Sequence, residues 1–284
     1  MRFFSEPIGL PEGIFIILRD LIRERLGLHY ETSKLELLAD KLYPRLVERG
    51  CDSFLDYYYL LKYNPIGDEE WRYLSDALAV PETFFWREID CVQALVNVLL
   101  PQYLANAKFA NNVVRIWSAA CSTGEEPLTI AIALNEGGWF DKLPIEIYAS
   151  DASQSAIAKA KQGIYRERSF RNLPPLIKAK YFHPVEEGWQ VIPTLHTRIR
   201  WITANLMAKS EVEPLTHAHF IFCRNVFIYF AESAIRQTAQ LFFDGMPSPG
   251  YLFLGTAESL LKLSTQFELQ EIEGAFAYVK ERNF

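Results

Sequence analysis

The chain has 284 residues, of which 50% are hydrophobic, 14% aromatic and 23% charged, so it can bury the core of one or two globular domains and is not a disordered protein. Its net charge of −6 argues against a protein that grips nucleic acid through the phosphates. No segment has the ~20 consecutive apolar residues of a membrane span, and the N-terminus carries no secretory apolar run. The four cysteines form no C-x-x-C pair, so we expect no metal site, no disulfide scaffold and a cytoplasmic location.

Helical patterns fill the first part of the chain. Apolar residues recur at helical spacing from Phe15 to Leu26, and Gly27 follows as a stop signal. A second helix is expected after Thr32-Ser33, although Pro44 should kink or end it because proline lacks an N–H. A third helix is expected over 54–61. We therefore predict a small all-helical domain over residues 1–88. The buried face of the second helix should consist of Leu35, Leu38, Leu42 and Leu46.

Two groups of basic residues are candidates for contact with an acidic partner. On the second helix, the spacing of Lys34, Lys41, Arg45 and Arg49 places them on one stripe of an ideal helix. The alternative is a solvated stripe that nearby acidic residues balance. The second group is the run 159–180, in which seven basic residues accompany one acid; an ordinary solvated surface is again the alternative.

From about residue 110 the pattern changes to strands that alternate with helices. Strands are expected at 113–117, 145–149, 220–223 and 250–254, and a helix at 127–134. Such alternation favours a mostly parallel sheet with helices on both faces.

A turn of small residues, 118–124, joins the first of these strands to a helix that begins with Glu125 and Glu126. Small residues let the backbone approach a ligand closely. Two carboxylates at a helix N-terminus favour a cationic ligand over a phosphate, and the G-x-G-x-x-G pattern of dinucleotide-binding sites is absent. Simple capping by these carboxylates is the alternative.

Two further polar positions lie where parallel strands should end. Asp151 ends the second strand, where open α/β folds bind the ribose hydroxyls of an adenosine ligand. Arg224 and Asn225 interrupt an apolar stretch at the end of a later strand. Because a buried arginine without a partner is costly, a role in a site is favoured over packing.

Four segments resemble a known family. Residues 80–88, 116–127, 221–230 and 250–260 are closely similar to the motifs of the chemotaxis receptor glutamate methyltransferases, called CheR, and the resemblance runs from about residue 12 to 280. It implies an α/β fold: a Rossmann-like class I methyltransferase sheet in residues 89–284, behind the N-terminal helical domain. It also implies a small antiparallel β insertion at about 181–200.

The resemblance further implies S-adenosylmethionine as cofactor and S-adenosylhomocysteine as product. Tyr229 is expected to be the catalytic residue that orients the substrate carboxylate. Pro81 stands where the family usually has Asn, so that position is not assigned to the site. The cofactor-binding residues implied are Thr83, Arg87, Ala119, Glu126, Asp151, Asn205, Leu206, Arg224 and Asn225.

The implied substrate is a glutamate side chain on the cytoplasmic helices of a methyl-accepting chemotaxis receptor. We expect a monomer that binds no nucleic acid and does not insert into the membrane. The loop 183–191 is short and has one glycine. Because tether-dependent members of the family tend to have more glycine there, the resemblance favours docking without a receptor tether. Two alternatives stay open: a non-catalytic signalling relative that keeps the cofactor pocket, and a methyltransferase for another protein substrate.

Overall fold

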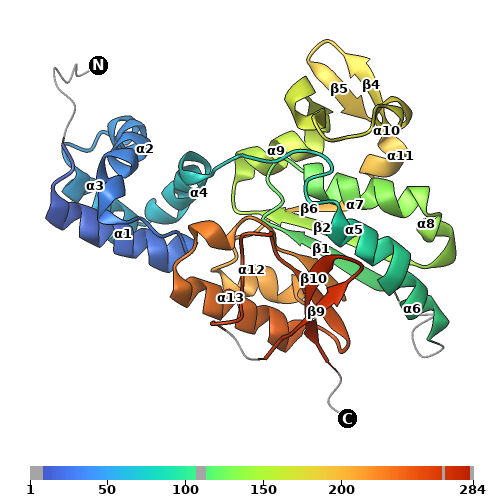
Figure 1. The fold of residues 1–284 in the computed structure, drawn as a ribbon. Coiled ribbons are helices and arrows are strands. Elements are labelled where there is room, and N and C mark those ends of the chain that lie inside the picture. The colour runs from blue at the N-terminus through green and yellow to red at the C-terminus, as the bar shows by residue number, and fades with distance from the viewer. Residues whose placement is uncertain (1–8, 107–112, 264–265, 282–284) are drawn as a thin grey trace.

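The computed structural model describes residues 9–106, 113–263 and 266–281. A helical domain and a larger α/β domain lie side by side, and a small sheet projects from the α/β domain (Figure 1). No helix in the described part of the chain is both long and apolar enough to cross a membrane.

In its described residues, the N-terminal domain has four helices around one hydrophobic core. These are α1 (Glu12–Leu26), α2 (Leu35–Glu48), α3 (Phe54–Tyr63) and α4 (Gly67–Leu78), with a 3-10 turn (Thr32–Lys34) before α2. The predicted apolar faces are buried: Phe15 and Leu18 of α1 meet Leu38 and Leu42 of α2 in the same core. Gly27 ends α1 in the left-handed conformation, as the stop signal predicted.

Pro44 was expected to kink or end the second helix, and the second of these alternatives is wrong. Pro44 lies inside α2, which continues to Glu48. The packing of Leu42 and Leu46, which are fully buried on either side of it, outweighs the lost hydrogen bond.

Part of the predicted basic stripe, on α2, is not an open surface. Arg45 is buried, and its guanidinium donates to both carboxylate oxygens of Glu70 on α4, at 2.8 and 2.6 Å. Arg49 contacts the same carboxylate, and Lys41 donates to the carbonyls of Ala77 and Leu78. The expectation that this stripe is available to a partner is therefore wrong for Arg45 and Arg49, because both already bind Glu70.

The α/β domain has a seven-stranded sheet with the order β6-β2-β1-β7-β8-β10-β9. The first five strands in this order are parallel, and β10 is antiparallel to both β8 and β9. This order confirms the class I methyltransferase sheet. The strands are β1 (Val114–Ala119), β2 (Ile145–Asp151), β6 (Ile199–Thr203), β7 (Phe220–Phe222), β8 (Gly250–Phe253), β9 (Glu268–Ile272) and β10 (Ala275–Lys280).

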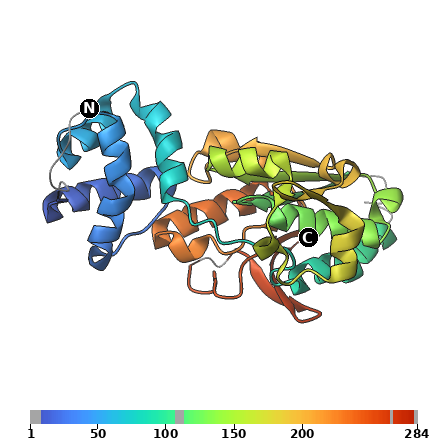
Figure 2. The same cartoon turned by 90° about the horizontal axis from the view of Figure 1, so that it is seen from above.

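Helices cover both faces of this sheet (Figure 2). Trp117 of β1 is fully buried against Phe242 of α13, with 5.3 Å between ring centroids, while Ile116 belongs to a second core on the other face. The helices are α5 (Asp90–Ala94), α6 (Leu100–Ala105), α7 (Glu125–Glu136), α8 (Trp139–Lys142), α9 (Gln154–Gln162), α10 (Pro175–Tyr181), α11 (Pro193–His196), α12 (Lys209–Val212) and α13 (Glu232–Gly245), with a π-helical turn (Leu95–Leu99) between α5 and α6 and 3-10 turns at Glu167–Phe170, Glu213–Leu215 and Phe227–Tyr229.

The small projecting sheet is antiparallel, with the strand order β3-β5-β4. The expected insertion contains β4 (Phe182–Val185) and β5 (Gly188–Val191), and the third strand, β3 (Ile164–Tyr165), comes from an earlier part of the chain.

Candidate functional site

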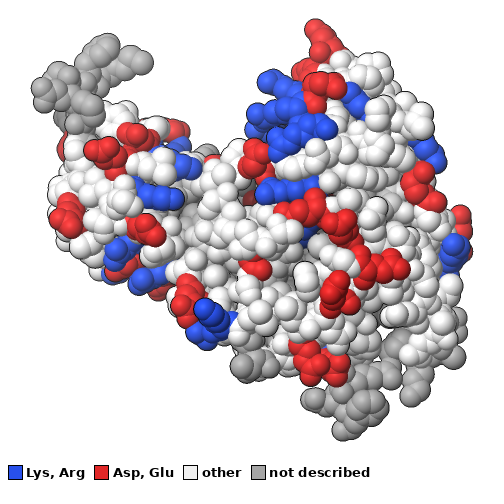
Figure 3. All heavy atoms as spheres, viewed as in Figure 1, with Lys and Arg blue, Asp and Glu red and all other residues white. Residues whose placement is uncertain are grey.

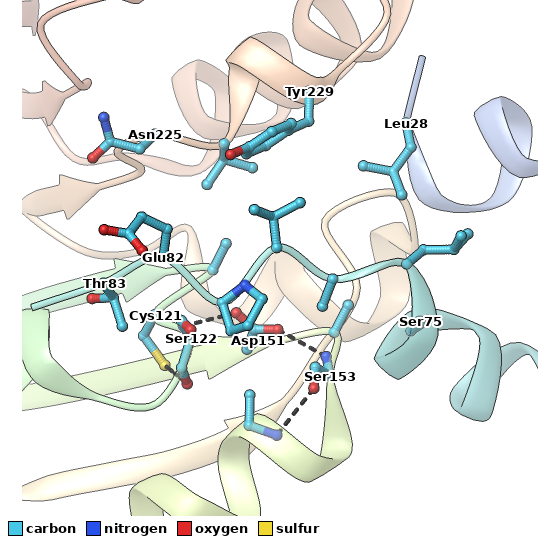
Figure 4. Close-up of a pocket in the computed structure, with 18 of the residues that line it drawn as sticks. Leu28, Ser75, Glu82, Thr83, Cys121, Ser122, Asp151, Ser153, Asn225 and Tyr229 are labelled. Atoms are coloured by element: carbon cyan, nitrogen blue, oxygen red, sulfur yellow. Dashed lines mark hydrogen bonds between the residues drawn. The ribbon is translucent and has the colours of Figure 1, made fainter. Parts of the chain in front are cut away.

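A cavity of about 410 Å³ lies at the carboxyl ends of β1, β2 and β7, where the helical domain meets the sheet. This edge is the ligand side of open parallel sheets, and the volume falls in the usual range for small-molecule sites. Figure 4 shows Asn225 and Tyr229 on one side of the cavity, and Ser122, Asp151 and Ser153 on the other. The cavity brings together most of the residues predicted from the sequence: Thr83, Arg87, Glu126, Asp151, Asn205, Leu206, Arg224, Asn225 and Tyr229.

Ala119 is not among the residues that line the cavity. Its side chain is 1% exposed and packs in the core beside α13. Its neighbours Ala120, Cys121 and Ser122 line the cavity instead, because the chain leaves the sheet plane only after the last residue of β1.

The turn after β1 contains backbone conformations with positive φ, which its small residues can adopt. Gly124 has a φ of +96°, and a Cβ there would lie 2.8 Å from the Trp201 ring, so only glycine fits. Ala120 and Ser122 also have positive φ, at 55° and 50°. Such conformations are uncommon outside glycine and concentrate at ligand sites.

Asp151 is held by backbone groups of two neighbouring loops. Its Oδ2 accepts a hydrogen bond from the N–H of Ser122 and its Oδ1 accepts one from the N–H of Ser153, both at 2.8 Å. Burial raises the pKa of Asp151, and the two N–H donors lower it in part. Each oxygen keeps a second lone pair for an acceptor role toward ligand hydroxyls.

Arg224 and Glu126 form the most buried charged pair of the site. The Arg224 side chain is 3% exposed, and its Nη1 lies 3.0 Å from Glu126 Oε2. Ser118 donates to the other oxygen of Glu126 at 2.7 Å. Burial raises the pKa of Glu126, and the charge of Arg224 opposes that rise.

Glu88 is a second carboxylate on Arg224 that the sequence analysis left without a role. Arg224 Nη2 lies 3.1 Å from Glu88 Oε2 and also donates to the carbonyl of Arg87 at 2.7 Å. Burial raises the pKa of Glu88, but Arg224 outweighs this effect, so the pKa lies below its usual value. The signal was present in the segment 80–88, which ends with this acid.

The helical domain contributes directly to the segment that carries Tyr229. His29 donates its backbone N–H to the carbonyl of Tyr229, and Ala231 donates to the carbonyl of Gly27, both at 2.8 Å. Asn205, predicted only as a cofactor residue, donates from its side chain to the carbonyl of Arg25 at 2.7 Å. The two domains are therefore joined at the rim of the cavity.

These groups fit S-adenosylmethionine. Asp151 offers acceptors for ribose hydroxyls, and Glu126 offers negative charge to a cationic ligand. Arg224 Nε is a buried donor with no acceptor among the described residues. Since buried donors are rarely left unpaired, it fits an acceptor supplied by a ligand.

Comparison with known proteins agrees with this arrangement. The family "CheR methyltransferase, SAM binding domain" matches residues 81–276, and "CheR methyltransferase, all-alpha domain" matches residues 15–79. The chain is 34% identical to "Chemotaxis protein methyltransferase 2" of Vibrio cholerae, over 96% of this chain and 94% of the relative.

Two further relatives span almost the whole chain. It is 30% identical to "Chemotaxis protein methyltransferase" of Escherichia coli, over 94% of this chain and 91% of the relative. It is 31% identical to "Probable biofilm formation methyltransferase WspC" of Pseudomonas putida, over 91% of this chain and 60% of the relative. With both family domains present in order, the chain belongs to the CheR family and is an S-adenosylmethionine-dependent methyltransferase.

Proposed function

We propose that the protein transfers a methyl group to glutamate side chains on the cytoplasmic helices of a chemotaxis receptor, as a cytoplasmic monomer. The observation that carries the proposal is the position of Tyr229. It lies at the surface between the two domains and is 37% exposed, yet it lines the same cavity as Glu126, Asp151 and Arg224. A side chain from a partner protein can therefore reach the residues that we infer hold the cofactor.

The chemistry needs little from the protein beyond placement. Bound S-adenosylmethionine supplies an electrophilic methyl group. A glutamate carboxyl with an ordinary pKa of about 4.3 is ionised at neutral pH, so no general base is needed. The remaining task is to orient the carboxylate and exclude water. Tyr229 has a hydroxyl that points into the cavity and can donate to a carboxylate oxygen (Figure 4).

Replacing Tyr229 with phenylalanine is expected to lower kcat about 10- to 100-fold, since it removes the orienting donor. The dissociation constant for S-adenosylhomocysteine should change less than threefold. The assay is transfer of radiolabelled methyl to receptor-containing membranes, scored as base-labile ester, alongside calorimetry. Equal losses of rate and cofactor affinity would make Tyr229 a binding or packing residue. Absence of base-labile label with the wild-type chain would contradict the proposed substrate.

A methyltransferase for a different signalling protein is the second candidate, because one relative carries a biofilm name. The same label distinguishes the two: receptors should become labelled in the first case, and another protein of the cell extract in the second.

We infer that the receptor docks on a basic face of the α/β domain. Figure 3 shows Lys and Arg gathered on the wall of a notch, on the side of the small sheet that faces the helical domain. The residues of this basic face are Lys159, Lys161, Arg166 and Arg168; all are exposed, and within the described ranges none forms an ion pair. Lys159 also lines the cavity. A receptor helix that carries substrate glutamates is acidic and complements this face.

Reversing Arg166 and Arg168 to Glu should raise KM for receptor by roughly tenfold, since exposed charge pairs contribute about 0.2–1 kcal/mol each and reversal adds repulsion. Added salt should raise KM of the wild type and have a smaller effect on the variant. A matched control reverses exposed Lys142 and Arg198, which lie at the end of α8 and just after α11 and do not line the cavity. Equal losses in both variants would implicate net charge alone, and no loss in either would exclude the basic face.

A further inference from the structure

The carboxylate of Glu258 lies against the backbone of the loop that connects Arg224 to Tyr229. Its Oε2 accepts hydrogen bonds from the N–H groups of Gly255 at 2.6 Å and Asn225 at 2.8 Å. Its Oε1 accepts from the N–H groups of Val226 at 2.7 Å and Ile228 at 3.2 Å. One side chain from the loop after β8 thus satisfies three donors of the segment that precedes Tyr229.

This contact is shaped for a carboxylate. Converging backbone N–H groups form an anion-binding concavity, and no Lys or Arg of the described chain forms an ion pair with Glu258. Asn225 has a φ of 60°, a conformation that persists only where its surroundings hold it. Gly255 lets the two loops approach: a Cβ there would lie 2.5 Å from Asn225 Nδ2.

Glu258 does not line the cavity, whereas Arg224, Asn225, Val226 and Tyr229 do. It can therefore affect the reaction only through the loop. The helical domain holds the far end of the same segment, through the hydrogen bond from His29 to the Tyr229 carbonyl. The loop is thus fixed on both sides, and Glu258 provides the fixing contact within the α/β domain.

We propose that Glu258 is a positioning residue for methyl transfer, which keeps the Arg224–Tyr229 loop in the shape that directs Tyr229 into the cavity. The proposal rests on the role proposed above for Tyr229. The proposal requires that the side chain at position 258 has two acceptor oxygens. A carboxamide of the same size has one acceptor and an NH₂ group, so it opposes two of the four N–H donors.

The test compares Glu258→Gln with Glu232→Gln, an exposed glutamate on α13 whose ion pair with Arg236 lies outside the site. For Glu258→Gln we expect kcat to fall about 10- to 100-fold, with KM for receptor nearly unchanged. Hydrogen exchange at the amides of Asn225, Val226 and Ile228 should accelerate, a readout independent of activity. Glu258→Asp keeps both acceptors and should recover part of the rate. The control should match the wild type in all measurements.

A double-mutant cycle with Tyr229→Phe separates this proposal from the proposed function. If Glu258 acts through Tyr229, the combined variant should lose much less than the product of the two separate losses. Independent, multiplicative losses would overturn the route through Tyr229. Unchanged exchange at the three amides would overturn the positioning role even if rate were lost. Failure of the wild type to methylate receptors would contradict the proposed function alone, since the exchange test would still decide whether Glu258 holds the loop.

Discussion

Replacing Glu70 with alanine is expected to destabilise the helical domain by about 3–5 kcal/mol, the usual cost of removing one partner of a buried ion pair. The Glu70 side chain is fully buried, and it accepts hydrogen bonds from Arg45 and, at 2.7 Å, from the hydroxyl of Tyr57. Without it, the Arg45 guanidinium, whose side chain is 11% exposed, keeps only the exposed Glu48 as an ion-pair partner among the described residues. Hydrogen exchange of α2 and α4 amides in the intact chain measures the loss.

The matched control is its neighbour Glu69, which is 57% exposed and pairs with Arg49 at 3.4 Å. Glu69→Ala should change the free energy of unfolding by less than about 0.5 kcal/mol, as for other exposed pairs. Equal effects of the two substitutions would show that helix propensity, and not the buried cluster, sets the stability.

The same cluster predicts a pH dependence. Burial raises the pKa of Glu70, but the hydrogen bonds from Arg45, Tyr57 and Arg49 outweigh burial, so the folded pKa lies below the unfolded value. The stabilisation is therefore complete above the unfolded pKa of about 4.3 and is lost as pH falls through the folded pKa. Urea unfolding between pH 7 and pH 3 should show this acid-linked loss in the wild type and a smaller one in Glu70→Gln.

Glu70 also shows where sequence reasoning about the helical domain stops. Helical periodicity placed Arg45 and Arg49 on one face of α2 and located the leucines that are buried. The partner of both arginines lies on α4, more than 20 residues later. The residues next to Glu70 in the sequence do not show that its side chain is buried. The arginines that bind it were therefore interpreted as an exposed basic stripe. The expectation that the helix could end at Pro44 failed for a similar reason, since tertiary packing overrode the local preference of proline.

For the α/β domain the local signals were stronger. The sequence showed a strand, then a turn of small residues, then a helix that begins with acidic residues. Each of these features depends on residues close together in the sequence, so the pattern could be recognised without the fold. It correctly placed Glu126 and Asp151 at the cavity. Glu88 and Glu258 were not assigned, although both lie in recognised motifs. Their roles depend on which loop returns beside Arg224, and that information is held only in the folded arrangement.

Replacing Arg224 with methionine is expected to weaken binding of S-adenosylhomocysteine by about 2–5 kcal/mol, or roughly 30- to 5,000-fold, since it removes the buried cationic donor, Nε, that we infer pairs with an acceptor of the ligand. Arg224 is the cation that lies between Glu126 and Glu88, at 3.0 and 3.1 Å, and it also binds the Arg87 carbonyl. Arg224→Lys should rescue little, because an ammonium cannot reach both carboxylates and the carbonyls as a planar guanidinium does. Calorimetry gives the affinities.

Loss of folding is the competing explanation, and a second substitution separates it from loss of the site. Arg224→Met combined with Glu126→Gln removes one of the two stranded charges, so the melting temperature should rise toward that of the wild type while cofactor affinity stays low. Arg236→Met, which removes an exposed guanidinium from α13, controls for the change of residue type and should leave the affinity within threefold. Glu126 also lines the cavity, so the reference for affinity is Glu126→Gln alone. Recovery of stability together with the affinity of Glu126→Gln would show that Arg224 only compensates Glu126. Recovery of stability with an affinity below that of Glu126→Gln would place Arg224 in the binding machinery, because its charge and its buried Nε would then be required by the ligand and not by the fold.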